Sequence, residues 1–128
     1  MLRGMRDSIA PVILAYTLLV VCIGTLLGPA LVGRERLAFR DVSHFYTPLY
    51  EYVAARQFED WGSLWNPLDL TGIPLAGETT TAVFYPVRIA VYALAPSSEI
   101  AMTWYVVIHL LIAAVAIHIA AKSAGARP

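Results

Sequence analysis

The chain has 128 residues, of which 59% are hydrophobic and only 14% are charged, and its mean hydropathy is +0.65. Soluble domains average about 45–50% apolar and about 25% charged residues, so this balance indicates a membrane protein. Nine basic and nine acidic residues cancel, which excludes the strong positive charge that recruits nucleic acid. The single cysteine excludes a disulfide within the chain.

The first predicted element is a membrane-spanning helix over residues 9–33, a segment without Asp, Glu, Lys or Arg. A helix of about 25 residues extends about 37 Å, enough to cross a hydrocarbon core of about 30 Å. Pro11 fits its first turn, and Gly28-Pro29 is expected to kink or fray the far end. The alternative is a cleaved signal peptide, which is disfavoured because the apolar run is too long and no Ala-x-Ala site follows it.

Residues 34–99 form a long polar loop rich in prolines, glycines and aromatic residues. Thr47-Pro48 predicts a helix start, because Thr is a good N-cap and Pro suits the first helical position. We expect an amphipathic helix over residues 48–61. Its apolar stripe consists of Tyr50, Val53, Ala54, Phe58 and Trp61. Two interpretations are open: the stripe lies flat at the membrane interface, or it packs on the remainder of a larger protein.

The second half of the loop combines turn residues with a short apolar segment. Gly72 allows a positive φ, and Asn66 and the proline after it favour a turn. Residues 82–95 are apolar except for Arg88, and they are too few to span a bilayer, so they predict a re-entrant or interfacial helix. The preferred interpretation of Arg88 is that it extends to the lipid headgroups. The alternative is that it holds an anionic group such as a lipid phosphate.

A second membrane-spanning helix is predicted over residues 100–121, with Lys122 directly after it. His109 and His118 lie inside this segment, about 180° apart around the helix axis. We prefer the interpretation that both histidines pack against other helices, the alternative being a proton relay or a ligand.

The fold predicted from these segments is an all-α membrane protein. Two transmembrane helices are joined by a long extracytoplasmic loop that contains short juxtamembrane helices. The loop carries five basic and eight acidic residues, whereas both ends of the chain are basic. The positive-inside rule therefore places residues 1–8 and 122–128 in the cytoplasm. The predicted location is the cell (inner or plasma) membrane, with the lipid bilayer as the first partner.

The candidate site lies at the start of the loop, at Asp41, His44 and Tyr46. Asp41 and His44 are three residues apart and would share a face on a helical turn. One interpretation is a general base that takes a proton from a hydroxyl group. A second is a divalent metal or phosphate-bridging site with Glu78 as the only other candidate ligand, although zinc requires three or four ligands.

A third interpretation of Asp41 is purely structural, and the spacing alone favours it. Asp41 would pair with Arg36 or Arg40 and cap the turn that follows. The chain contains no glycine-rich phosphate loop, no Cys/His cluster and no serine nucleophile motif, so no other catalytic signature competes with this acid.

The loop motifs resemble a known family when they are taken in order. They are Asp41, Tyr46-Thr47-Pro48, Leu64-Trp65-Asn66-Pro67, Gly72-Ile73-Pro74-Leu75 and Phe84-Tyr85-Pro86. Over residues 8–125 this order is similar to the N-terminal part of YfhO-type bacterial membrane proteins. Those proteins are related to the GT-C superfamily of glycosyltransferases, which use polyprenyl-phosphate-linked sugars.

The resemblance implies that Asp41 is the catalytic base of sugar transfer from a lipid-phosphate donor at the outer membrane face. His44, Tyr46 and Glu78 are further candidates for substrate contact, and Arg88 is assigned to the donor phosphate by its chemistry rather than by a motif. The partners implied are the lipid-linked sugar donor and the remaining transmembrane helices of a longer protein, of which this chain is expected to be an N-terminal part, inactive alone. The alternative is a non-enzymatic two-span membrane protein whose outer loop binds a partner or lipid.

Overall fold

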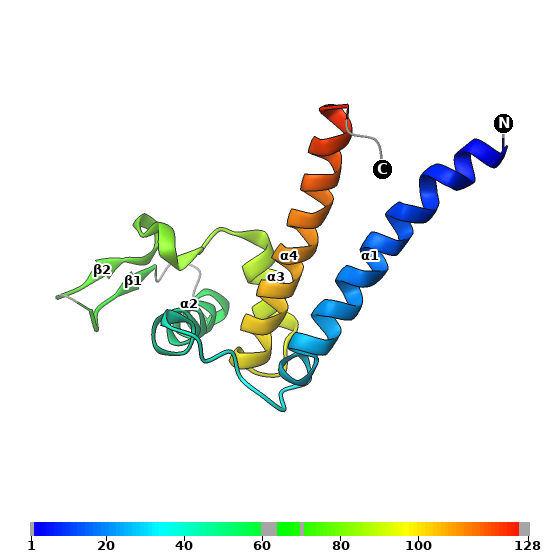
Figure 1. Ribbon diagram of the computed structural model, residues 1–128. Coiled ribbons are helices and arrows are strands. Elements are labelled where there is room, and N and C mark those ends of the chain that lie inside the picture. The colour runs from blue at the N-terminus through cyan, green and yellow to red at the C-terminus, as the bar shows by residue number, and fades with distance from the viewer. Residues whose placement is uncertain (1, 60–63, 70, 126–128) are drawn as a thin grey trace. The chain divides into compact units, whose positions relative to one another are not determined.

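The computed structural model describes residues 2–59, 64–69 and 71–125 and is mostly helical. The long helices are α1 (Leu2–Leu31) and α4 (Ser98–Ser123), and the shorter ones are α2 (Thr47–Glu59) and α3 (Pro86–Leu94), as Figure 1 shows. Two strands of two residues each, β1 (Trp65–Asn66) and β2 (Ile73–Pro74), add a small β-ladder that the all-α prediction does not include. The chain divides into a helical unit, Met1–Pro29 with Val107–Pro128, and a loop unit, Ala30–Val106.

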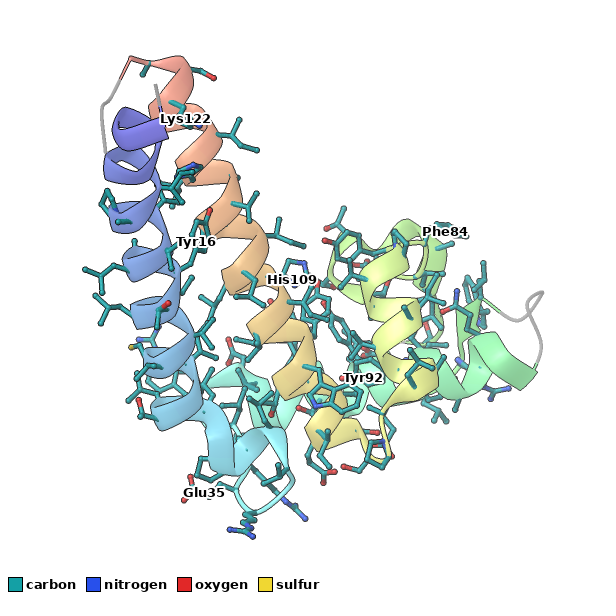
Figure 2. All side chains as sticks on the ribbon, turned by 90° about the vertical axis from the view of Figure 1, so that its right-hand side faces the viewer. Tyr16, Glu35, Phe84, Tyr92, His109 and Lys122 are labelled. Atoms are coloured by element: carbon teal, nitrogen blue, oxygen red, sulfur yellow. The ribbon has the colours of Figure 1, made fainter. Side chains whose placement is uncertain are left out.

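The part of the chain that the structure describes contains two helices long and apolar enough to cross a membrane, over Ile9–Leu31 and Ser98–Ser123, which confirms both predicted apolar helices. Helix α1 begins at Leu2, so Pro11 lies in its interior. The prediction that Pro11 occupies the first turn is therefore wrong. Within the helical unit the rings of Tyr16 on α1, labelled in Figure 2, and His118 on α4 meet edge to face, with centroids 5.8 Å apart. This contact gives His118 the packing role expected from the sequence.

A π-helical turn, η1 (Val42–Tyr46), leads directly into α2 within the loop unit. Thr47 has helical dihedral angles, and its hydroxyl donates a hydrogen bond of 2.7 Å back to the carbonyl oxygen of Val42. The prediction that Thr47 is an N-cap is therefore wrong. A capping residue needs non-helical angles and accepts a bond from a later N–H group, whereas here the backbone is already helical before Thr47.

The apolar stripe of α2 is buried inside the loop unit. Tyr50, Val53 and Ala54 are all buried, and Val53 packs with Leu75 and Val83 in the core of this unit. The interpretation that these three stripe residues lie flat in the membrane interface is therefore wrong. Trp61 and the side chain of Phe58 lie outside the described residues.

Strands β1 and β2 pair antiparallel, with Trp65 opposite Pro74. Gly72 has a φ of +112°, which confirms the prediction of a positive φ at this position. A Cβ atom added to Gly72 would lie 2.5 Å from Cζ2 of Trp65, so the indole ring covers the glycine at close range. Both the angle and the contact require glycine here.

Helix α3 begins later than the predicted segment 82–95. Ala82 has a φ of +50°, and the N–H of Tyr85 donates to its carbonyl oxygen at 3.0 Å, so residues 82–85 form a turn. Pro86 then occupies the first turn of the helix, as predicted. The carbonyl groups of Ala82 and Val83 in this turn accept hydrogen bonds from the side chain of Arg88.

The two ends of the loop unit are joined by contacts between residues 31–36 and the first turns of α4. Trp104 donates its indole N–H to the carbonyl oxygen of Leu31 at 3.3 Å. Arg36 forms an ion pair with Glu99 at 3.4 Å. These two contacts connect the start of the loop unit to its end.

Candidate functional site

The carboxylate of Asp41 is exposed just before η1, and its side chain makes no capping hydrogen bond. The two arginines assigned to it are engaged elsewhere. Arg36 pairs with Glu99, and the guanidinium of Arg40 lies 5.6 Å from the centroid of the Phe39 ring. The structural interpretation of Asp41, as a capping and ion-paired residue, is therefore wrong, and no ion pair holds it within the described part of the chain.

The turn after Asp41 is wider than an α-helical turn. The N–H of Thr47 bonds to the carbonyl oxygen of Val42, five residues earlier, as in a π-helix. The shared face predicted for Asp41 and His44 assumed α-helical spacing, which this turn does not have. His44 is exposed. Single π turns occur frequently at functional sites, so this irregularity favours a functional role for the segment.

A small pocket of about 90 Å³ adjoins this turn. Its lining residues are Arg36, Leu37, Ser43, Thr47, Glu99 and Met102. Pockets for whole ligands measure about 300–1,000 Å³, so this one has room for a single functional group. Among residues 2–59, 64–69 and 71–125 no three His, Cys, Asp or Glu side chains could hold a metal ion. The metal interpretation of Asp41, His44 and Glu78 therefore lacks its ligand set.

Arg88 lies in the core of the loop unit, with 0% of its surface exposed. Its Nε donates to the carbonyl oxygen of Ala82 at 2.8 Å, and its Nη2 donates to that of Val83 at 3.1 Å and to the side-chain oxygen of Gln57. The preferred prediction that Arg88 extends to lipid headgroups is wrong. Burial lowers the pKa of the guanidinium, and the nearby tyrosines Tyr50 and Tyr92 oppose this effect.

Three tyrosines, Tyr50, Tyr92 and Tyr105, are near enough to this buried cation to raise its pKa. The Tyr50 centroid lies 5.8 Å from that of Tyr92, 5.6 Å from that of Tyr105 and 6.0 Å from that of Tyr46, in edge-to-face geometry. Burial raises the pKa values of the Tyr50 and Tyr92 hydroxyls above their usual range, so both groups are neutral at physiological pH. We call Tyr50, Gln57, Arg88, Tyr92 and Tyr105 the Arg88 cluster.

The structure separates the predicted site residues into three places. Asp41 and His44 lie on the exposed π turn, and the half-buried Tyr46 leads from that turn to the Arg88 cluster through Tyr50. The side chain of Glu78 is exposed. In the described residues no hydrogen bond, ion pair or ring contact joins Asp41 or Glu78 to Arg88, so these residues do not form one site within this chain.

The sequence interpretation missed Gln57 and Tyr92. Gln57 is fully buried and lies seven residues after Tyr50, on the buried stripe of α2. A polar residue two helical turns after Tyr50, on the same face as the apolar stripe, is the sequence signal that could have identified Gln57. Tyr92 follows Arg88 by four residues on α3, a spacing that brings two side chains to one face of a helix.

No protein-family model, curated protein or solved structure matches this chain. Only the sequence and the structure of this chain therefore indicate which class of protein it belongs to. Two helices that are long and apolar enough to cross a membrane support a membrane protein.

Proposed function

We propose that the chain is a multi-pass protein of the cell membrane, with α1 and α4 crossing the bilayer and the loop unit on the outer face. The apolar side chains of the Ile9–Leu31 segment are almost entirely unburied within the protein. Such a surface is unfavourable in water and matches the hydrocarbon interior. The basic residues Arg3, Arg6 and Lys122 lie near the cytoplasmic ends of the two helices in this arrangement.

Within this arrangement the loop unit carries the catalytic base of a membrane glycosyltransferase, of which this chain is the N-terminal part. The observation that carries the proposal is the exposed and unpaired carboxylate of Asp41. This carboxylate is accessible to a substrate and lies ten residues after the end of α1. The resemblance of the loop motifs to YfhO-type proteins supports the same assignment.

In the proposed reaction the Asp41 carboxylate accepts the proton of an acceptor hydroxyl. The acceptor oxygen then bonds to the anomeric carbon of the sugar, and the bond from that carbon to the phosphate oxygen breaks. The lipid phosphate leaves with the electron pair of the broken bond. The pocket lined by Arg36 and Ser43 next to the turn has room for one group of a substrate.

The test is the substitution Asp41→Asn in the full protein in membranes, because it keeps the shape of the side chain and removes its basicity. Sugar transfer from a polyprenyl-phosphate donor should fall at least about a hundredfold, as expected for the loss of a general base. The matched control is Asp69→Asn, the same change at another exposed acid of the loop unit. Wild-type transfer by the Asp41→Asn variant would refute the catalytic assignment.

A second candidate function is supported by the apolar side chains on the surface of the loop unit. Phe39 is 75% exposed, Leu68 82% and Phe84 66%, and Figure 2 shows Phe84 at the outer edge of this unit. We take these three side chains as the candidate contacts for lipid or protein. In this function the outer loop is a non-enzymatic binding module, and Asp41→Asn has no effect on binding.

A further inference from the structure

Two buried hydrogen-bond donors in the Arg88 cluster have no partner. They are Nη1 of Arg88 and the hydroxyl of Tyr92, and both atoms are inaccessible to solvent. Arg88 and Tyr92 are four residues apart on α3, so their side chains leave the same face of the helix. Leaving a buried donor unpaired is costly, and two such donors on one helix face indicate a common acceptor.

The charge of Arg88 is also uncompensated among the described residues. Its bonding partners, the carbonyl groups of Ala82 and Val83 and the amide of Gln57, are neutral. Arg88 lies in the first turn of α3, where the helix dipole is positive and favours a negative charge. In the described residues no acid forms an ion pair with Arg88.

Among the described acids, Glu51 influences the Tyr92 hydroxyl. It lines a surface pocket together with Tyr92 and raises the pKa of the Tyr92 hydroxyl as a smaller contribution after burial and Tyr50. Glu51 is exposed to solvent, so its charge is screened by water and does not neutralise the buried guanidinium.

We infer that Nη1 of Arg88 and the hydroxyl of Tyr92 bind a small monovalent anion, such as chloride, inside the loop unit. The anion accepts hydrogen bonds from both unpaired donors and neutralises the buried cation. A lipid phosphate does not fit this role, because Arg88 has no exposed surface from which a headgroup could reach it. The bound anion stabilises the packing of α2, α3 and the start of α4, to which the Arg88 cluster belongs.

The experiment measures thermal unfolding of the full chain in detergent micelles, in sodium chloride and in sodium gluconate at equal ionic strength. All three tryptophans belong to residues 30–106, so tryptophan fluorescence reports on the loop unit. A chloride concentration ten times the dissociation constant should raise Tm by roughly 5–10 °C relative to gluconate. The line width of the ³⁵Cl NMR signal gives an independent measure of binding.

The diagnostic variant is Tyr92→Phe, which removes one donor and keeps the ring. Its Tm should lose most of the chloride dependence, and the ³⁵Cl line should narrow. The matched control is Tyr52→Phe, because Tyr52 also carries a buried hydroxyl without a partner but lies beside Arg56, whose guanidinium is 5.5 Å from the ring centroid. This control should respond to chloride like the wild type.

Equal Tm values of the wild type in chloride and gluconate would overturn the inference. An equal response of the Tyr92→Phe and Tyr52→Phe variants would overturn it as well. The site is separate from Asp41, so Asp41→Asn should leave the chloride response unchanged. The inference therefore does not depend on the proposed sugar transfer.

Discussion

At the scale of single residues, the burial of Arg88 depends on Gln57. The amide of Gln57 has two roles: its oxygen accepts from Nη2 of Arg88, and its Nε2 donates to the carbonyl oxygen of Val83 at 3.0 Å. Because both groups are buried, water cannot replace either bond. Gln57 therefore links α2 to the turn before α3, and its removal should affect the whole loop unit.

We predict that Gln57→Leu lowers the free energy of unfolding of the loop unit by about 2–3 kcal/mol, because it removes an acceptor from a buried charged donor. Gln57→Glu is the informative counterpart. It keeps acceptor oxygens for Arg88 but loses the Nε2 donor to the carbonyl oxygen of Val83. The adjacent Arg88 guanidinium should hold the pKa of the new carboxyl below its usual range. The stabilisation by the pair of this carboxylate and Arg88 should thus be complete at neutral pH and be lost as the pH falls through that pKa.

Chemical denaturation followed by tryptophan fluorescence measures both variants. Equal denaturation midpoints for Gln57→Leu and the wild type would show that the amide does not hold Arg88. The new carboxylate should also replace the proposed anion, so Gln57→Glu should lose the chloride dependence at neutral pH.

Asp41 was selected as the site candidate by its position at the start of the loop and by the resemblance of the loop motifs. The structure leaves its side chain exposed, and its catalytic role stays a prediction. The burial of Arg88 could not be predicted, because its acceptors are backbone carbonyl groups presented by a turn at Ala82 with a φ of +50°. A positive φ at an alanine has no signal in the sequence, since alanine rarely adopts it.

At the scale of elements, the long apolar helices were predictable and the short irregular elements were not. Hydropathy over some twenty residues identifies a helix such as α1 or α4 without any tertiary contact. Strands β1 and β2 have two residues each, too few to show an alternating pattern. The π turn reversed the expected role of Thr47, because the sequence signature of a helix start assumes that the preceding residues are not helical.

The hairpin of β1 and β2 depends on Gly72. We predict that Gly72→Ala destabilises it by at least about 2 kcal/mol, since the new methyl group meets both an unfavourable φ and the Trp65 ring. Limited proteolysis between the strands and the fluorescence of Trp65 measure the change. In the matched control, Gly77→Ala, the nearest neighbour of the new methyl group is Cγ of Pro74 at 3.3 Å. Its effect should stay within about 1 kcal/mol, and an equal effect of both substitutions would contradict the assignment.

At the scale of the whole molecule, the two units divide the chain chemically. The helical unit exposes apolar side chains such as Leu14, Leu18 and Ile117, whereas the loop unit buries polar side chains, including Arg88 and Gln57, beside its apolar core. The hydrocarbon of a bilayer is a favourable surrounding for the apolar surface of the helical unit and an unfavourable one for the polar side chains of the loop unit. Crossing of the bilayer by both long helices would put the two termini on one side and the loop unit on the other, and this is the arrangement that the charge distribution favours.

Cysteine labelling tests this arrangement directly. The native Cys22 lies in the middle of α1, so Cys22→Ser gives a background without thiols. In this background Glu78→Cys places an exposed thiol on the loop unit, and Ala124→Cys places one after the end of α4. A membrane-impermeant maleimide added to intact cells should label the thiol at position 78 and should label the thiol at position 124 only after lysis. The reverse pattern would place the loop unit in the cytoplasm, where it could not act on a lipid-linked sugar at the outer face.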